Sequence, residues 1–456
     1  MTQSADEGFT TRQVHAGSDA RAARPRALPI YMTAGFPFDG FDDAAAHFDQ
    51  GDGFGYTRTG NPTVDAVERK IASLEGGAQA LLVASGQAAV TVVLLGLLSA
   101  GEHIVCATHI YEGTRGLIID NLARLNIEVD FVDDVNDPAE WESKIRPTTR
   151  VLFAESIANA RNDLLDIASI ARVADGHGIP LVVDNTFATP YLLRPIEHGA
   201  AIVVHSASKF LAGQGSVLGG VIIDDGRFDV ARSGALFPQF TETGRLGGPS
   251  LADRHGGLAR IAYLRETVAP RLGPTPSPLN AFLVGQGLET LSLRVQRQSE
   301  NALVVAEWLS TRPEIASVDY IGLPSHPHHA LAGRYLPRGN GSVFTFTLRG
   351  GIDEARAFVE ALQVITHMTH LGDVRSLILH PGTTSHVRRT PEEREAHGVL
   401  PGTLRVSIGI EDSADLIADL ARGLDASHPR VATVSGAIEQ SSAIEERIEL
   451  AVEVAA

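Results

Sequence analysis

Lysine is nearly absent from this chain, although basic residues are not. Of the 38 lysines and arginines in 456 residues, only Lys70, Lys144 and Lys209 are lysines. Arginine stays protonated and forms no Schiff base, whereas a lysine forms one once burial or a neighbouring charge lowers its pKa. A lysine retained in such a chain indicates chemistry that needs a primary amine.

Only one of the three lysines has a setting that suits this chemistry. Lys70 and Lys144 lie among charged residues in helix-like segments, and we expect them on solvated faces. Lys209 instead follows a short apolar run, and a glycine-rich stretch from Gly213 to Gly220 comes after it. The alternative for Lys209 is a strand-end lysine that simply reaches into solvent.

Cysteine is rarer still, because Cys106 is the only one and lies in an apolar run. It has no partner for an internal disulfide, so we expect a reducing compartment and a buried, inert thiol. The first residues are polar and acidic and contain no apolar signal core. The longest apolar stretch, residues 88–98, is too short to span a bilayer. The sequence therefore predicts a cytoplasmic protein with no membrane partner.

Positive charge is also scarce relative to negative charge. There are 55 acidic residues against 38 basic ones, which gives a formal net charge of −17. Such an excess disfavours nucleic acid and anionic membranes as partners, so we expect a small-molecule substrate. We expect no metal site. The length and the hydrophobic content of 44% predict two globular domains with appendages.

Strands and helices alternate between residues 78 and 223. The apolar runs there are continuous, which is typical of strands buried on both faces. With helical stretches between them, they predict an α/β domain with a mostly parallel seven-stranded sheet. Ligands in such folds lie beyond the carboxyl ends of the strands. The predicted strands are 80–84, 104–107, 127–132, 151–154, 181–184, 202–205 and 220–223.

The rest of the chain divides around this domain. The first 60 residues lack a sustained period, and their aromatic side chains need another domain or subunit to cover them. Long helices over 260–298 lead to a smaller α+β domain with helices at 299–309 and 352–362 and strands at 343–348 and 403–408. A helix is conceivable over 444–454. The predicted segments are an arm (1–60), a large domain (61–260), a C-terminal domain (261–424) and a tail (425–456).

Two charged residues mark the edge where a ligand is expected. Asp184 closes one predicted strand and Lys209 follows the next, so both project from the same edge of a parallel sheet. A strand-end carboxylate is most often a helix cap or an ordinary salt bridge. Beside a Schiff-base lysine, however, it would keep the ring nitrogen of pyridoxal 5′-phosphate protonated, so that the ring acts as an electron sink. The turn Ser85-Gly86-Gln87, between a strand and a helix, offers free N–H groups to a phosphate.

Several motifs in the chain occur in the order of a known family. They are Tyr56-Thr57-Arg58-Thr59-Gly60-Asn61-Pro62-Thr63, Ala84-Ser85-Gly86, Val183-Asp184-Asn185-Thr186-Phe187, His205-Ser206-Ala207-Ser208-Lys209 and Leu404-Arg405-Val406-Ser407. Over residues 10–424 the chain resembles the Cys/Met-metabolism enzymes that depend on pyridoxal phosphate (PLP). The resemblance implies the aspartate-aminotransferase-like (type I) fold.

The resemblance also implies a role for each residue of the predicted site. Lys209 would carry the cofactor and move protons, Asp184 would pair with its ring nitrogen, and Tyr111 would stack on the ring and assist acid–base steps. The implied cofactor residues are Tyr56, Arg58, Ser85, Gly86, Gln87, Tyr111, Asp184, Thr186, Ser206, Ser208 and Lys209, of which Tyr56 and Arg58 would act on a neighbouring subunit. The implied substrate residues are Asn159, His370, Ser376 and Arg405.

Among the family's branches, the homoserine-ester sulfhydrylases are the most similar. Cystathionine-type relatives carry a glutamate where Arg375 stands, and methionine lyases carry a cysteine where Gly113 stands. The resemblance therefore implies γ-replacement on O-acetyl-L-homoserine by sulfide, giving homocysteine and acetate. The open alternatives are a methionine or homocysteine γ-lyase and a cystathionine γ-synthase-type enzyme that uses another acyl group. A non-catalytic nucleotide-binding protein is a further alternative, but the glycine loop does not open the first strand–helix unit.

Five residues depart from the family pattern near the site, two of them being Ala160 in place of a proline and Ser208 in place of a threonine, which keeps the hydroxyl. Glu112 replaces the usual glycine, Gln214 replaces a histidine, and His370 stands where relatives have serine or asparagine. These departures leave the predicted cofactor site intact and put the acyl group and the nucleophile in question. A site shared between subunits implies at least a dimer, and the family is usually tetrameric.

Overall fold

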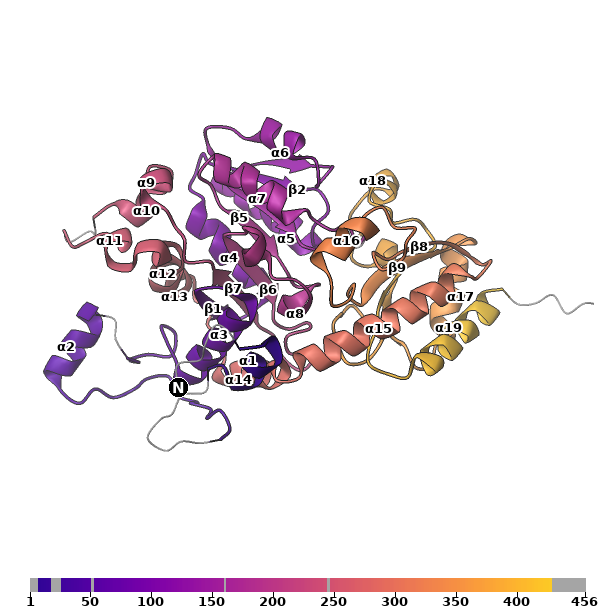
Figure 1. Cartoon of the computed structure of the whole chain (residues 1–456), viewed down its shortest axis with the longest axis horizontal. Helices are drawn as coiled ribbons and strands as arrows, with labels where there is room; N and C mark the ends of the chain where they lie inside the picture. Colours follow the sequence, from indigo (N-terminus) through magenta and orange to yellow (C-terminus); the bar gives the residue numbers. More distant parts are fainter. Residues whose placement is uncertain (1–6, 18–25, 51–52, 160, 244–246, 429–456) are drawn as a thin grey trace, which may run out of the picture.

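The computed structural model describes residues 7–17, 26–50, 53–159, 161–243 and 247–428. The helix considered over 444–454 and Ala160 lie outside these residues. Two lobes of unequal size make up the described chain, with the helix α15 running from one to the other (Figure 1).

The larger lobe is built on a seven-stranded sheet, as predicted. Its strands lie in the order β1-β7-β6-β5-β4-β2-β3, and only β7 runs antiparallel to its neighbours. The strands are β1 (Gln79–Val83), β2 (His103–Ala107), β3 (Glu128–Val132), β4 (Thr149–Glu155), β5 (Leu181–Asp184), β6 (Ile202–Ser206) and β7 (Gly220–Asp224). The predicted mostly parallel α/β sheet is therefore confirmed.

Helices surround this sheet and begin where the sequence provides caps. The α3 helix starts at Pro62 after the Asn61 cap, and Gly76 ends it at a φ of 78°. The helices of this lobe are α1 (Phe9–His15), α2 (Phe41–Gln50), α3 (Pro62–Glu75), α4 (Gly86–Leu97), α5 (Glu112–Gly116), η1 (Leu117–Leu122), η2 (Ala123–Leu125), α6 (Pro138–Lys144), α7 (Ile167–Gly176), α8 (Thr189–Leu192), η3 (Pro195–His198), α9 (Val230–Ser233), α10 (Pro238–Thr241), α11 (Leu251–His255), η4 (Gly256–Leu258), α12 (Ala259–Tyr263), η5 (Leu264–Val268), α13 (Ala269–Leu272) and α14 (Pro278–Leu288).

The smaller lobe is an α+β unit with a five-stranded sheet in the order β10-β11-β12-β9-β8. Its strands are β8 (Ile315–Asp319), β9 (Val343–Leu348), β10 (Thr366–His367), β11 (Leu377–Leu379) and β12 (Thr403–Ser407). Its helices are α15 (Leu291–Ser310), α16 (His329–Tyr335), α17 (Gly351–Ala361), η6 (Pro381–Thr383), α18 (Pro391–Ala396) and α19 (Ser413–Ser427).

The helix predicted at 299–309 is not separate, which corrects the sequence analysis. It is the second half of α15, because no glycine or proline interrupts Leu291–Ser310. Val295 in the first half of α15 belongs to one hydrophobic core, and Ala302 in its second half belongs to the other. One continuous helix therefore belongs to both cores and fixes the lobes relative to each other.

The N-terminal arm contains two helices that the sequence analysis did not predict. The α1 helix packs on the large lobe, where Phe9 is buried, but α2 lies away from the body of the molecule (Figure 1). Phe41 and Phe48 of α2 are 90% and 83% exposed. An arm with such apolar exposure needs a surface outside the chain to cover it.

Candidate functional site

The carboxyl ends of β5 and β6 bring the two predicted key residues to one edge of the large sheet. The strands are parallel neighbours, and Asp184 at the end of β5 pairs with Val204 of β6. Lys209 follows three residues after β6 ends. A bond between the strand ends fixes this edge, because the Ser206 N–H donates to Thr186 Oγ1 at 2.9 Å. Parallel pairing thus produces the juxtaposition that the sequence predicted.

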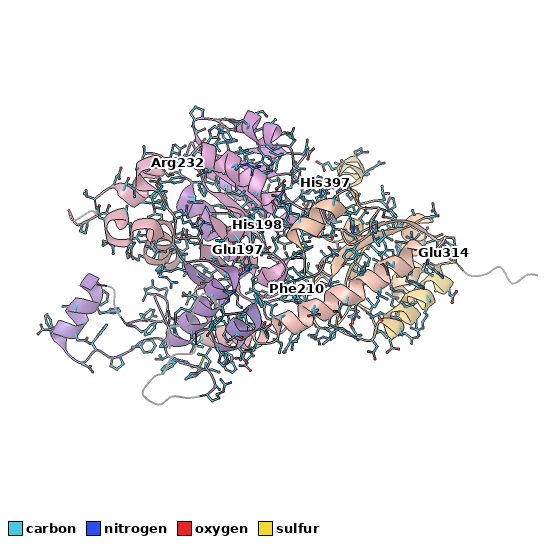
Figure 2. All side chains as sticks on the ribbon, in the orientation of Figure 1. Glu197, His198, Phe210, Arg232, Glu314 and His397 are labelled. Carbon is cyan, nitrogen blue, oxygen red and sulfur yellow. The ribbon has the colours of Figure 1, made fainter. Side chains whose placement is uncertain are left out.

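Lys209 lies where the two lobes meet. Its neighbour Phe210 is placed at this junction in Figure 2, and a side chain at Gly372 of the small lobe would come within 2.7 Å of the Phe210 nitrogen. The Lys209 amine lies 3.1 Å from Nδ1 of His370. Burial, followed by the charge of Arg405, lowers the pKa of Lys209 to about 8. The amine is therefore neutral in a useful fraction near physiological pH.

Asp184 shares the edge with a second buried carboxyl group, Glu155. The two residues are paired across β4 and β5. Burial and the Asp184 charge raise the pKa of Glu155 to about 8. Burial also raises the pKa of Asp184, although two bonds from Thr186 to Asp184 Oδ1, at 2.9 and 2.5 Å, oppose this. A cationic ring nitrogen beside Asp184 would favour its charged form.

The start of α4 forms a cradle for an anion. Ser85 caps this helix through the Ala88 N–H, and the backbone here is pressed against the strands β6 and β7. A Cβ atom at Gly86 would lie 2.7 Å from Cβ of Ser206, and one at Gly220 would lie 1.9 Å from the Ser85 oxygen. Because both positions are glycine, the start of α4 can approach β6 and β7 this closely. The first N–H groups of the helix then face the site.

Two of the predicted hydroxyl groups have partners elsewhere in the structure. Ser208 is buried and bonds to the N–H and C=O of Gly219, at 3.0 and 3.2 Å. Ser376 is fully buried, donates to Glu411 at 2.9 Å and accepts from the Gly409 N–H at 2.8 Å. The structure therefore gives both hydroxyls a role in holding loops and does not bring Ser376 to the lysine.

Asn159 and Arg405 come together from different lobes. The Arg405 Nη1 group donates to Asn159 Oδ1 at 3.3 Å, and Nη2 lies 3.5 Å from the carbonyl oxygen of His370. Burial lowers the pKa of Arg405 to about 10, so it remains a cation at neutral pH. A buried guanidinium of this kind is a natural carboxylate site, because it offers two parallel donors.

Tyr111 lies on a turn that several charged groups hold in place. Its N–H donates to Glu155 at 2.6 Å, and its side chain is 51% exposed. Gln87 reaches the same turn through a 3.1 Å bond to the Gly113 oxygen. Glu112, a departure from the family, pairs with Arg389 of the small lobe. The exposed ring is free to cover a cofactor, while its backbone is fixed.

Tyr56 and Arg58 lie on the arm, and their contacts are not with Lys209. Tyr56 is 50% exposed, and the Arg58 guanidinium lies 5.4 Å from its ring centroid. Arg58 also donates to the Pro270 oxygen at 2.8 Å. The two side chains thus lie on the outside of the chain.

The glycine loop after Lys209 docks on the small lobe. The Val374 N–H donates to the Gly213 oxygen at 2.9 Å, and Arg375 donates to the Gln214 oxygen at 2.8 Å. Gln214 is exposed, so the histidine that relatives carry there has no counterpart at this position. The imidazole near the lysine comes instead from His370, on the facing loop.

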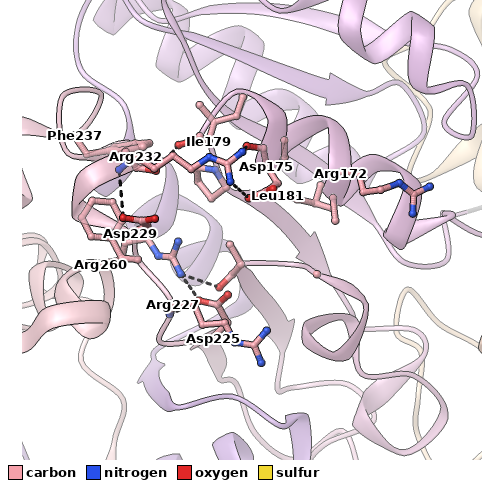
Figure 3. Close-up of a pocket in the computed structure, with 18 of the residues that line it drawn as sticks. Arg172, Asp175, Ile179, Leu181, Asp225, Arg227, Asp229, Arg232, Phe237 and Arg260 are labelled. Carbon is pink, nitrogen blue, oxygen red and sulfur yellow. Dashed lines mark hydrogen bonds and ion pairs between the residues drawn. The ribbon is translucent and has the colours of Figure 1, made fainter.

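A cavity of about 560 Å³ lies elsewhere. It opens at the start of β5, on the opposite edge of the sheet, and Leu181 is part of its lining. Figure 3 shows two ion pairs in this lining, Arg232 with Asp175 and Arg260 with Asp225, whereas Arg172 and Arg227 are drawn without an ion-pair line. Cavity size alone would therefore point away from the predicted site.

No helix in the described ranges has the length and apolar character needed to cross a membrane. Within the same residues, no group of three or more His, Cys, Asp and Glu side chains is arranged to hold a metal ion. Cys106 is a fully buried free thiol, and burial raises its pKa.

Known proteins match this chain over most of its length. A family model for the Cys/Met metabolism PLP-dependent enzymes matches residues 10–425. The chain belongs to this family. It shares 43% identity over 429 residues with an O-acetyl-L-homoserine sulfhydrylase of Corynebacterium glutamicum, covering 92% of this chain and 97% of that protein. An O-succinylhomoserine sulfhydrylase of Pseudomonas aeruginosa is 38% identical over 437 residues, covering 93% of this chain and 100% of that protein.

A solved structure supports the same assignment. A Campylobacter jejuni protein, crystallised as an O-acetylhomoserine (thiol)-lyase, aligns with a TM-score of 0.88 and 34% identity, covering 92% of this chain and 100% of that chain. That structure contains an N′-pyridoxyl-lysine-5′-monophosphate. The type I PLP-enzyme fold that the sequence predicted is therefore confirmed.

The residues present in this PLP-family member fit the cofactor. The edge offers a lysine of lowered pKa and a buried carboxylate whose Oδ1 is oriented by Thr186. It also offers a helix start where a Cβ atom would fill the space at Gly86. An amine for the aldehyde, an acid for the ring nitrogen and N–H donors for the phosphate are thus all present.

Glu155 is the residue that the sequence analysis missed. Its two carboxyl oxygens accept from the N–H groups of Tyr111 and Asn159, at 2.6 and 3.2 Å. It therefore positions one residue on each side of the site. The signal was available, because Glu155 closes the apolar run Val151–Ala154 as Asp184 closes Leu181–Val183.

Proposed function

We propose that this protein catalyses PLP-dependent γ-replacement on O-acetyl-L-homoserine, with sulfide or a related thiol, giving L-homocysteine and acetate. The observation that carries the proposal is that Asp184 and Lys209 follow from neighbouring parallel strands at one sheet edge, with the charge of Arg405 near the lysine. The sulfhydrylase names of the relatives support the choice of reaction within the family.

Arg405 and Asn159 hold the substrate's carboxylate in this proposal. Arg405 is buried and cationic, and its Nη1 already donates to Asn159. A carboxylate entering here would accept from the guanidinium through two hydrogen bonds. That anchor leaves Cα of the amino acid toward Lys209, whose pKa Arg405 helps to lower. His370 contacts the same region through its carbonyl oxygen.

Lys209 is the proton carrier. Bound pyridoxal 5′-phosphate supplies an electron sink that makes the protons on Cα and then Cβ removable. A lysine with a pKa of about 8 accepts such protons and returns them at neutral pH. Tyr111 covers the site and assists acid–base steps, and Glu155 keeps the tyrosine turn in place. Asp184 would pair with the ring nitrogen of the cofactor, and Gly86, Gln87 and Ser206 would hold its phosphate.

The test is a product assay on purified full-length protein with pyridoxal 5′-phosphate. We expect homocysteine and acetate in equal amounts from O-acetyl-L-homoserine and sulfide. O-succinyl-L-homoserine in a parallel assay distinguishes the acyl group that the enzyme prefers. Absence of homocysteine with every acylhomoserine, despite full cofactor absorbance, would reject the reaction while retaining the family.

A γ-lyase is the second candidate within the family. It would release α-ketobutyrate and ammonia from methionine or homocysteine without an added nucleophile. Gly113, beside Tyr111, is where methionine lyases carry a cysteine, which favours replacement over elimination. Keto-acid detection after incubation with methionine alone separates the two reactions. A cystathionine γ-synthase-type enzyme would instead use another O-acylhomoserine with cysteine as the nucleophile, and repeating the product assay with cysteine in place of sulfide would report it as cystathionine.

We propose that the site is completed by residues of a second subunit. The protein would then be a homo-oligomer, at least a dimer and, as in most of the family, a tetramer. Tyr56 and Arg58 are exposed on the arm, and the α2 aromatics next to it are uncovered. In a dimer these two side chains would reach the partner's phosphate site. Mixing Arg58→Ala chains with Lys209→Ala chains tests this. If the site is shared, each hybrid dimer has one complete site, with Lys209 from one chain and Arg58 from the other, and activity returns. We also propose a cytoplasmic location, where Cys106 remains a thiol.

A further inference from the structure

The loop that carries His370 is pinned against the lysine from two sides. Gly372, at a φ of 72°, approaches the Phe210 nitrogen so closely that a Cβ atom would lie 2.7 Å away. Its own N–H donates to Ser407 Oγ at 2.9 Å, and Val374 bonds to the Gly213 oxygen. The loop therefore has little freedom. The packing of this loop therefore places His370 next to Lys209.

The imidazole has one partner and one unused atom. Nδ1 lies 3.1 Å from the Lys209 amine, whereas Nε2 is buried without a partner among the described residues. When Lys209 is an ammonium it has only donors, so Nδ1 is then the acceptor and the neutral imidazole carries its proton on Nε2. Gly215 closes the Nε2 side, because a Cβ atom there would lie 3.8 Å from Nε2 and 2.7 Å from Asp373 Oδ2.

We propose that His370 is a positioning residue for Lys209: its Nδ1 accepts a hydrogen bond from the free amine and orients it whenever the amine is not joined to the cofactor. This role rests on the proposed function, in which Lys209 must be released and then move protons.

The charges around the pair keep this acceptor available. Lys209, Arg375 and Arg405 face the imidazole with positive charge and Asp373 with negative charge. Burial and then the Lys209 charge lower the pKa of His370 to about 4, far below that of Lys209 at about 8. The imidazole therefore stays neutral while the lysine titrates. An acceptor for the ammonium stabilises it, so loss of the acceptor should lower the pKa of the lysine.

The experiment compares His370→Asn with His370→Leu. The two replacements are similar in size, and only asparagine keeps an acceptor near the position of Nδ1. Cofactor is removed from the full-length chain, and the rate of recombination with pyridoxal 5′-phosphate is followed by absorbance against pH. Only the neutral amine reacts, and the other titrating groups are the same in every variant, so the shift of the midpoint between variants reports the change in the pKa of Lys209. His198→Asn and His198→Leu, at the far edge of the sheet, are the matched controls.

We expect the His370→Leu midpoint to fall by about one pH unit, the size of a hydrogen bond to a charged group. His370→Asn should stay within about 0.3 unit of the native chain, and both His198 variants should not move. In γ-replacement, His370→Leu should lose about tenfold in kcat with little change in KM, since orientation and not binding is lost.

Two outcomes would overturn the proposal. One is a native midpoint in His370→Leu, and the other is an equal fall in His370→Leu and His370→Asn. If the leucine variant does not fold, His370→Ala replaces it in the same comparison. Failure of the proposed function is seen separately, because native protein would then make no homocysteine while the recombination profiles still test the lysine contact.

Discussion

The two edges of the large sheet both bury charge, but they use it differently. At the amino-terminal edge, Arg260 is buried between Asp224 and Asp225, and their attraction outweighs burial and raises its pKa. At the carboxyl-terminal edge, Lys209 is half-buried near Arg405, another cation, and Asp184 lies opposite Glu155, another carboxyl group, on the neighbouring strand. Opposite charges in contact stabilise the fold. Like charges near each other disfavour the charged forms, so the pKa of a lysine falls and that of a carboxyl group rises, both toward neutral pH.

This difference locates the chemistry better than cavity size does. The cavity of about 560 Å³ lies at the paired edge, yet Arg232 and Arg260 in its lining are already paired with aspartates. The site at the other edge holds groups whose charges are incomplete without a ligand. We expect substitutions at the first edge to change stability, and substitutions at the second to change cofactor binding and turnover.

The largest expected effect is at the unpaired edge. Lys209→Ala should lower γ-replacement by about 10³-fold or more, because no other amine is available to carry the cofactor and its protons. Homocysteine formation and cofactor absorbance measure both losses. Lys144→Ala, which removes a lysine paired with Glu140 on α6, is the control and should retain activity. Activity above a tenth of the native level in Lys209→Ala would contradict the assignment.

The next effect is at the paired edge and concerns stability alone. Arg260→Met should lower the free energy of unfolding by about 3–5 kcal/mol, because Asp224 and Asp225 are left buried without their cation. Urea unfolding measures the loss. Adding Asp224→Asn should recover part of it. Below the unfolding range, cofactor absorbance should be native, and a loss of cofactor with unchanged stability would show that the two edges are not independent.

A pH experiment tests the carboxyl pair at the site. The pKa of Glu155 is raised from near 4.5 to about 8, so the folded chain holds a proton that the unfolded chain releases in this window. Native stability should therefore fall relative to Glu155→Gln as pH rises from about 4.5 to about 8, by at most about 1.4 kcal/mol per pH unit. Parallel unfolding curves across pH measure this. A constant difference would mean that Glu155 is ionised throughout.

The smallest expected effect joins the site to the small lobe. Glu112 and Arg389 form an ion pair whose side chains are 24% and 9% exposed. A double-mutant cycle with Glu112→Ala and Arg389→Ala should give a coupling of about 0.5–1 kcal/mol in unfolding. The surface pair Arg69–Asp65 is the comparison and should give about 0.3 kcal/mol. A coupling no larger than that of the surface pair would show that the Glu112–Arg389 ion pair does not stabilise the contact between the lobes.

Local patterns were enough for the elements that carry the site. The apolar run ending in Asp184 predicted β5 with its observed bounds, and Pro62 and Ser85 predicted two helix starts. Local patterns failed inside α15, where the sequence analysis divided one helix into two although no glycine or proline interrupts it. They also failed for the partners of side chains, because a motif does not say which way a hydroxyl turns. Ser376 bonds to Glu411, 35 residues away in the chain.

The sequence by itself determined that one lysine and one aspartate would stand at neighbouring strand ends, since hydrophobic periodicity and strand order suffice for that. Only the tertiary structure decided that His370, 161 residues from Lys209, would meet its amine. It also decided that Glu155 would hold the turn of Tyr111, and that Arg260 would be paired with Asp224 and Asp225. The physical reason is that secondary structure follows from short-range patterns. The pKa and the partner of a buried charge depend on what packing brings beside it.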